Sequence, residues 1–221
     1  MIYLSLLLAC SSEEPKDTAT ATPEGQDTAV IVFDEEYVHF GEENKRQVDV
    51  VIDFPDDAAT YGQITGRFAL ECPNDRCDWW DRYGTFGLVV DAGTETETYI
   101  ELDRFITPYR VGMVWESDLT DLRPLLTGTQ TIRVFIDTWV TENHSNGDGW
   151  LFTAELDYVG GPPPSPRAIA NVPVWGHLSW NAGLTDNPVE TQVVPQTVEL
   201  AAHSTAIFRS FISGHGWDNQ Q

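Results

Sequence analysis

Residues 47–54 read QVDVVIDF, a stretch in which apolar and polar side chains alternate with a period of two. One face carries the apolar Val48, Val50, Ile52 and Phe54, and the other carries Gln47, Asp49 and Asp53. Side chains along a strand point alternately to the two faces of a sheet. The pattern therefore predicts a half-buried strand whose apolar face lies on a core.

The same alternation returns in three later segments, at 98–106 (TYIELDRFI), 131–140 (TIRVFIDTWV) and 150–159 (WLFTAELDYV). Turn-forming stretches such as DFPDD, DAGTE and NHSNGDG separate the alternating segments. Short strands divided by turns are typical of an all-β sandwich. One helical turn is predicted in TDLRPLLTG, with Thr120 as its cap and Gly128 at its end.

The composition excludes some classes of partner. The chain has 221 residues, 41% of them hydrophobic, and 35 acidic against 12 basic residues give a net charge of -23. The apolar content is sufficient for packed cores. The negative charge repels phosphate backbones, so we expect no nucleic-acid partner, and anionic lipid head groups gain nothing electrostatically.

The first ten residues, MIYLSLLLAC, form an apolar run that is too short to span a bilayer but long enough for the core of an export signal. Leu8-Ala9-Cys10 followed by two serines resembles a bacterial lipobox, in which the cysteine is acylated. We therefore expect an exported protein, lipid-anchored at Cys10 in the bacterial cell envelope, at the outer membrane or cell surface. A short cleaved secretory signal and a buried apolar strand are the alternatives.

Composition also divides the chain. Residues 11–28 lack an apolar period and predict a disordered tether. A Pro-rich linker is expected at 161–166, since proline cannot donate to a sheet ladder. Residues 29–160 then form the first domain. Residues 167–221 have room for three or four strands, around VPVWGHLSW, QTVELAA and AIFRSFIS, so we expect a second, incomplete domain.

Three cysteines suggest one bond. If Cys10 is lipidated, Cys72 and Cys77 remain as a pair in a compartment that permits disulfides. Their spacing could also indicate a metal site, but zinc needs about four ligands and no further Cys or His lies nearby in sequence. A small disulfide loop is favoured.

No cofactor or metal is expected. The histidines contain no His-x-His pair, which disfavours copper. His144, Asn146, Asp148 and Glu155 loosely imitate a calcium loop, but a polar hairpin is favoured because the first ligand position is a histidine and the flanking segments are strands.

Residues 72–90 read CPNDRCDWWDRYGTFGLVV and combine indoles, acids and a base immediately after the two cysteines. Indole rings stack on the C–H faces of sugars, while carboxylates and arginine bind hydroxyls and amides. These types together indicate a carbohydrate site. Alternatively, Trp79 and Trp80 fill a core, and Asp81 forms a surface ion pair with Arg82.

A second acid lies in segment 131–140. Asp137 and Trp139 share the strand face opposite Ile132, Val134 and Ile136. An acid beside a tryptophan at this spacing is either part of a sugar-binding surface or the solvated side of an edge strand, and the pattern alone leaves both open.

Several motifs occur in an order that resembles the peptide-N-glycosidase F family: CPNDRCDWWDR (72–82), DRFITPYRVG (103–112), DLTDLRPLLTG (118–128), VFIDTW (134–139) and FISGHG (211–216). The resemblance covers roughly residues 30 to 217. It implies two antiparallel eight-stranded jelly rolls, related in fold to copper monooxygenases, with the active site between them.

The resemblance also implies roles for single residues. Asp81 matches the principal catalytic aspartate, and Asp137 stands in the place of a supporting glutamate. Arg82 and Trp139 match neighbours of the cleft, and Trp80 is expected to bind substrate beside them. Cys72 and Cys77 match the disulfide before the catalytic acid.

The implied reaction is hydrolysis of the amide between asparagine and the first N-acetylglucosamine of an N-linked glycan. Its partners would be N-glycosylated proteins or glycopeptides, and a monomer is expected. The family's second essential carboxylate lies in a cysteine-rich segment beyond SGHG, which this sequence does not contain before Gln221. We therefore expect slow glycan release. A non-catalytic glycan-binding or interaction module is the alternative function.

Overall fold

The structure is a computed structural model, and it describes residues 25–57, 60–175, 186, 188, 191, 193–199 and 205–213. The predicted signal segment, Cys10 and most of the tether lie outside these residues. No helix within them is long and apolar enough to span a bilayer.

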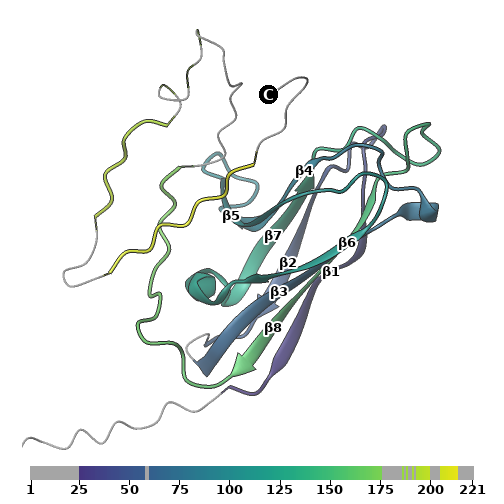
Figure 1. Cartoon of the computed structure of the whole chain (residues 1–221). Helices are drawn as coiled ribbons and strands as arrows, with labels where there is room; N and C mark the ends of the chain where they lie inside the picture. The colour runs from purple at the N-terminus through teal and green to yellow at the C-terminus, as the bar shows by residue number, and fades with distance from the viewer. Residues whose placement is uncertain are drawn as a thin grey trace, which may run out of the picture.

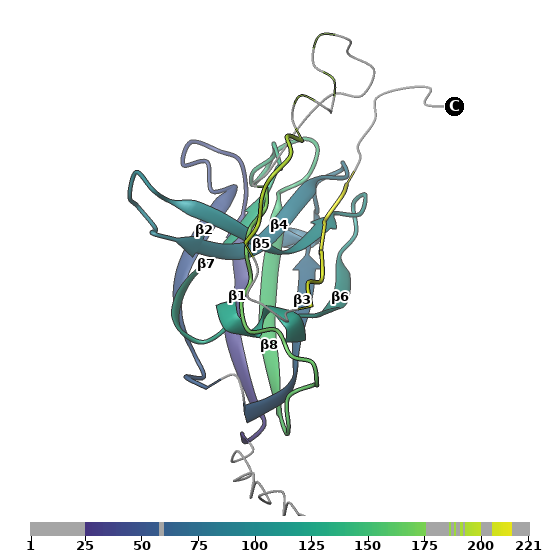
Figure 2. The same cartoon turned by 90° about the vertical axis from the view of Figure 1, so that its left-hand side faces the viewer.

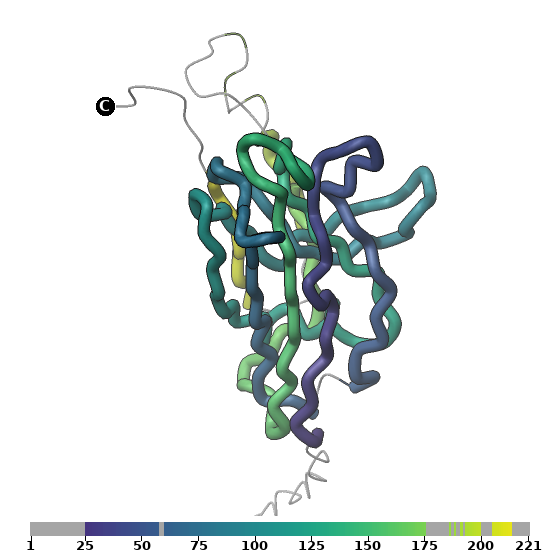
Figure 3. Tube along the Cα trace, turned by 90° about the vertical axis from the view of Figure 1, so that its right-hand side faces the viewer, coloured from purple at the N-terminus to yellow at the C-terminus, as the bar shows by residue number. Residues whose placement is uncertain are grey.

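Two four-stranded antiparallel sheets pack face to face. In chain order the strands are β1 (Thr28–Val38), β2 (Gln47–Phe54), β3 (Tyr61–Glu71), β4 (Tyr83–Val90), β5 (Thr98–Ile106), β6 (Met113–Asp118), β7 (Gly128–Ile136) and β8 (Trp150–Gly160). One sheet has the order β1-β8-β3-β6, and the other has the order β2-β7-β4-β5 (Figure 1). Figure 3 views the first sheet, in which green β8 runs between purple β1 and blue β3. The predicted all-β antiparallel sandwich is confirmed.

The alternating segments form strands because their apolar faces meet between the sheets. On β7, Ile132, Val134 and Ile136 are each fully buried, as predicted. From the opposite sheet, Phe152 of β8 packs on Phe105 of β5 and Phe86 of β4, with ring centroids 5.8 and 6.4 Å apart. The core is therefore rich in aromatic contacts, which add to the apolar area that the sandwich buries.

The predicted helical turn is present, but its cap is not Thr120. A 3-10 helix, η3, covers Thr120–Leu125, and no side chain caps it. The hydroxyl of Thr120 instead accepts a hydrogen bond of 3.1 Å from the amide of Ile64 in β3. Residue Thr120 is buried, and a buried hydroxyl is bonded to whichever backbone group the fold brings beside it.

The ends of the first domain are better defined by contacts than by composition. Within the stretch expected to be a tether, Gly25 donates its amide to the Thr60 carbonyl at 2.9 Å, and Asp27 accepts from the Gly160 amide at 2.7 Å. Residues 25–28 therefore already bind the sandwich.

Beyond Gly160, the described residues contain no strand. Residues 161–175 and 205–213 run beside the sandwich on the side of β5 (Figures 1 and 2). Arg104 of β5 donates to the Ser213 hydroxyl at 3.2 Å, and Arg209 donates to the Asp118 carbonyl at 3.3 Å. The strands expected at 172–180, 196–202 and 206–213 are thus not formed in the parts that can be followed, where no neighbouring strand pairs with them.

Candidate functional site

Four connections gather at one end of the sandwich, because successive antiparallel strands return their odd-numbered connections to the same end. They are residues 39–46, 72–82, 107–112 and 137–149, which we call the loop end. Backbone hydrogen bonds join them: the Trp79 amide donates to Asn146 at 3.0 Å, and the Phe40 amide donates to Val140 at 2.8 Å. The loop end is therefore a connected layer rather than a set of independent turns.

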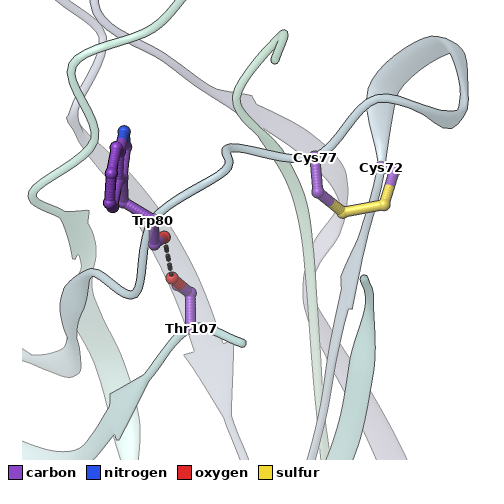
Figure 4. Close-up of a disulfide and its surroundings, with 4 residues drawn as sticks. All are labelled: Cys72, Cys77, Trp80 and Thr107. Atoms are coloured by element: carbon purple, nitrogen blue, oxygen red, sulfur yellow. Dashed lines mark hydrogen bonds between the residues drawn. A yellow bond between two sulfur atoms is a disulfide. The ribbon is translucent and has the colours of Figure 1, made fainter. Parts of the chain in front are cut away.

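The predicted disulfide is confirmed. Cys72 and Cys77 are bonded, with Cα atoms 4.2 Å apart, and the enclosed turn contains the short 3-10 helix η2 (Pro73–Asp75). Figure 4 shows the bond at the start of the segment that leads to Trp80, whose carbonyl accepts from the Thr107 hydroxyl at 3.4 Å. The disulfide thus restrains the beginning of the segment, and the 107–112 loop holds its end.

Asp78 organises this segment from inside the protein. Its carboxylate is fully buried. One oxygen accepts from the Trp80 amide at 3.1 Å, and the other accepts from Arg82 Nε at 2.8 Å and from the Thr138 hydroxyl at 2.7 Å. A buried charge is stable only when it is paired and hydrogen-bonded, and Asp78 satisfies both conditions.

Arg82 is oriented by this buried acid. Its Nε pairs with the buried Asp78 at 2.8 Å, and its side chain is 19% exposed. The Arg82 amide donates to the Thr107 hydroxyl at 2.8 Å, and its carbonyl accepts from the Thr107 amide at 2.8 Å. Both backbone and side chain of Arg82 are therefore fixed.

Asp81 is half-buried. It follows the exposed Trp80 in the chain and precedes Arg82, which pairs with the buried Asp78. A hydrogen bond from the Tyr109 hydroxyl to Asp81 raises the pKa of that tyrosine above its usual range, and partial desolvation and the negative charge of Asp81 act in the same direction. Tyr109 is 58% exposed, so this pair faces solvent at the loop end.

Asp137 and Trp139 follow directly after β7 and share an arginine. Arg46 donates to the Asp137 carboxylate at 3.0 Å. Its guanidinium also lies 4.4 Å from the centre of the Trp139 ring and 5.0 Å from that of Phe40. Trp139 remains 49% exposed, so part of the indole is accessible beside the carboxylate that Arg46 binds.

Comparison with known proteins identifies sequences and structures that are similar to this chain. A family model described as peptide-N-glycosidase F, N terminal, matches residues 87–148. The peptide-N(4)-(N-acetyl-beta-D-glucosaminyl)asparagine amidase F of Elizabethkingia miricola is 28% identical over 204 residues. That alignment covers 90% of this chain and 55% of the relative.

Solved structures of peptide-N-glycosidase F are also similar to this chain. Peptide-N-glycosidase F from Flavobacterium meningosepticum superposes with a TM-score of 0.54 and 30% identity, over 63% of this chain and 43% of that one. A crystal structure of the asparagine amidase at 2.2 ångström resolution also has a TM-score of 0.54 and 30% identity, over 62% and 43% of the two chains. The chain is similar to peptide-N-glycosidase F. It spans about half the length of the curated relative.

The residues that the resemblance to peptide-N-glycosidase F singled out all lie at one end of one sandwich. The amide of Asp137 donates to the Tyr83 carbonyl at 2.9 Å, two residues beyond Asp81. Trp79 and Trp80 are 37% and 48% exposed, so the alternative that they fill a core is wrong. The catalytic roles of Asp81 and Asp137, and the binding roles of Trp80, Arg82 and Trp139, stay predictions.

Sequence reasoning missed three residues that make contacts in the candidate site: Asp78, Tyr109 and Arg46. Asp78 and Tyr109 lie inside motifs that resemble peptide-N-glycosidase F, and that position was the only available signal. Nothing in the sequence marks Asp78 as buried, because its burial arises from loops that are distant along the chain.

The calcium-like sequence at 144–155 is divided in the structure between the polar loop 137–149 and the start of β8, which carries Glu155. The Asp148 carboxylate accepts from the Asn143 amide at 3.1 Å and from Asn74 Nδ2 at 3.2 Å, and it pairs with Arg76 at 3.3 Å. Its oxygens thus bind protein donors. Among the residues that the structure describes, no group of three or more His, Cys, Asp or Glu side chains could hold a metal ion.

Proposed function

We propose that this protein hydrolyses the amide bond between an asparagine side chain and the first N-acetylglucosamine of an N-linked glycan. The observation that carries the proposal is the joining of the Asp81 and Asp137 loops through Asp78, with exposed indoles on both. The kinship to an asparagine amidase supplies the reaction class.

Asp81 is the proposed water-directing carboxylate. Amide hydrolysis requires a group that orients or deprotonates water, and Asp81 is a half-buried carboxylate next to the exposed Trp80. Water adds to the amide carbon, the C–N bond breaks, and a proton reaches the departing nitrogen, which gives aspartate and a glycosylamine. Arg82 follows Asp81 in the chain, and its ion pair with Asp78 holds it in place.

Asp137 and the indoles are proposed to bind the sugar. The Asp137 carboxylate, held in position by Arg46, can accept hydrogen bonds from sugar hydroxyls. The free faces of Trp80 and Trp139 offer stacking surfaces for sugar C–H groups. Asp137 is one methylene shorter than the glutamate that the resemblance implies, and its pairing with Arg46 fixes where its acceptor oxygens lie.

The test is glycan release from a denatured N-glycoprotein, with mass detection of the change from asparagine to aspartate. Asp81→Asn should reduce the rate by about 10²–10⁴. Asp137→Asn should mainly raise KM. Asp75→Asn is the matched control, because it neutralises an exposed acid in the same disulfide loop and should leave the rate unchanged. Release that is insensitive to Asp81→Asn would remove this residue from the catalytic role.

A non-catalytic glycan-binding module is the second candidate. The stacked Arg46, Trp139 and Phe40 favour it, because such a surface binds sugars without any reacting group. Chitobiose-bearing glycopeptide that binds with no release under any condition would support this candidate over the amidase.

We also propose export, with lipid attachment at Cys10. The apolar segment 1–10 supports it, and so does the Cys72–Cys77 disulfide, since disulfides persist mainly in oxidising compartments. Labelling of expressing bacteria with a fatty-acid analogue, with Cys10→Ala as control, tests the anchor. The proposed unit 29–160 and the proposed monomeric state can be tested by limited proteolysis and by sedimentation.

A further inference from the structure

Arg110 differs from the other arginines at the loop end. Three of them are each paired with an aspartate: Arg46, Arg76 and Arg82. Arg110 is exposed, and none of the carboxylates in the described chain lies within ion-pair distance of it. In a protein with 35 acidic and 12 basic residues, an arginine without an acidic partner is unexpected, because acids are abundant and basic residues are few.

The guanidinium of Arg110 instead stacks on Trp79. It lies 4.0 Å from the centre of the indole, which is 37% exposed. Stacking on an aromatic face restrains the side chain and leaves the N–H groups at the edge of the guanidinium available. The cation is therefore held in one place before any ligand arrives.

The backbone of Arg110 is held in an unusual conformation. Its φ angle is +64°, in the left-handed region. The non-glycine residues with positive φ in the described chain are mostly asparagine or aspartate, which tolerate this region, and Arg110 is an exception. Its amide donates to the carbonyl of Asp78 at 3.1 Å, so the segment that positions Arg82 also fixes this turn. Such strain is typical of functional positions.

The stacked pair adjoins the proposed catalytic acid. Tyr109, the residue before Arg110, donates its hydroxyl to Asp81, and Trp79 precedes the exposed Trp80. Arg110 therefore follows a residue that contacts Asp81, and Trp79 lies two positions before Asp81 in the chain. Asp78, the residue before Trp79, is fully buried and already bonded to three donors.

We infer that Arg110, stacked on Trp79, is a subsite for a carboxylate of the substrate close to the scissile linkage. The inference rests on the proposed function. A planar guanidinium binds a carboxylate through two parallel hydrogen bonds, and a fixed guanidinium loses little entropy in doing so. The carboxylate can come from an acidic amino acid that flanks the glycosylated asparagine or from an acidic sugar of the glycan.

The test measures binding by calorimetry, with two matched pairs of glycopeptides. In the first pair, a residue flanking the asparagine is either glutamate or glutamine. In the second pair, the chitobiose core next to the asparagine either carries or lacks an attached acidic sugar. Arg110→Asn removes the cation and keeps a residue that tolerates positive φ. It should raise the Kd about 3- to 10-fold for the acidic member of at least one pair and leave the neutral members unchanged.

The pair that responds identifies the source of the carboxylate. Arg110→Lys keeps the charge without the planar fork and should lose part of the discrimination. Lys45→Gln removes another positive charge from the loop end, where the lysine is half-exposed and paired with Glu43, and should change neither pair. Thermal unfolding checks that all variants are folded.

Three results would overturn the subsite: wild-type protein that binds acidic and neutral ligands equally, an Arg110→Asn variant that loses affinity for both alike, or a Lys45→Gln variant with the same selective loss. Glycan release from the neutral glycopeptides is measured in parallel. It reports on the amidase alone, so failure of the proposed function and failure of the subsite are separate results.

Discussion

The hydroxyl of Thr138 donates a hydrogen bond of 2.7 Å to the buried carboxylate of Asp78. This bond connects the segment after the disulfide, which leads to Asp81, with the loop after β7, which carries Asp137 and Trp139. The two halves of the proposed site are thus fixed relative to each other by a residue pair that solvent does not reach, since both residues are fully buried.

Asp78→Asn should lower the free energy of unfolding by about 2–4 kcal/mol, because removing one partner of a buried ion pair leaves the other uncompensated. The new amide would also face the Arg82 or Thr138 donor. Urea denaturation followed by tryptophan fluorescence measures the effect. Thr138→Val loses a single hydrogen bond and should cost about 1 kcal/mol. Equal losses for the two variants would show that Asp78 does not organise the site.

Reduction of the Cys72–Cys77 bond should destabilise the protein by about 2 kcal/mol, as loop entropy predicts for so short a separation. The cysteines are five positions apart, so the loop that is released is small. Denaturation with and without a reducing agent measures the difference. The double variant Cys72→Ser/Cys77→Ser should be insensitive to the reducing agent, and sensitivity in that variant would assign the effect elsewhere.

Arg46→Leu should cost about 1 kcal/mol of stability, because a half-exposed ion pair and two ring contacts are lost together. It should also weaken glycopeptide binding by freeing Asp137 and Trp139. A double-mutant cycle with Asp137→Asn separates the ion pair from the stacking. A coupling energy of zero would mean that Arg46 acts through the rings alone.

Gly147→Ala should be strongly destabilising, by more than about 2 kcal/mol. Its φ is +111°, and an added Cβ would lie 2.1 Å from the carbonyl oxygen of Cys77. Gly93→Ala is the matched control, because its φ is +75° and nothing lies within 4 Å of the added atom. Similar costs for both variants would mean that backbone strain, and not the packing of the two loops, limits position 147.

Acidification should weaken the fold through His39. Burial first, and the nearby Lys45 second, hold the pKa of this imidazole below its ordinary value of 6.5. The unfolded chain therefore takes up a proton at a higher pH than the folded protein does. The contribution to stability is complete above pH 6.5 and decreases as the pH falls from 6.5 toward the folded pKa.

The measurement is the urea midpoint between pH 5 and pH 7.5, taken as a difference between wild type and His39→Gln. The difference should change with pH only over that window. A constant difference would show that His39 titrates alike in the folded and unfolded states.

Local patterns located several strands of the sandwich, although the strands expected after residue 171 are not formed in the described residues. The period-two segment 47–54 forms β2 with the predicted bounds, since alternation depends only on which residues can face a core. The disulfide also followed from counting cysteines and from the compartment. Thr120 was assigned wrongly as a helix cap, because its hydroxyl found a partner in β3, 56 residues away in sequence.

The sequence by itself determined that this chain forms a β-sandwich with a tight disulfide loop, because hydrophobic periodicity and cysteine spacing are local properties. The resemblance of its motifs also identified Asp81 and Asp137 as candidate site residues. Only the tertiary structure decided that Asp78 is buried between the loops, that Arg82 pairs with it, and that Arg110 stacks on Trp79. The burial of Asp78 against Thr138 and the stacking of Arg110 on Trp79 join segments from different connections of the sandwich. Their energies depend on burial and distance, which no local pattern encodes.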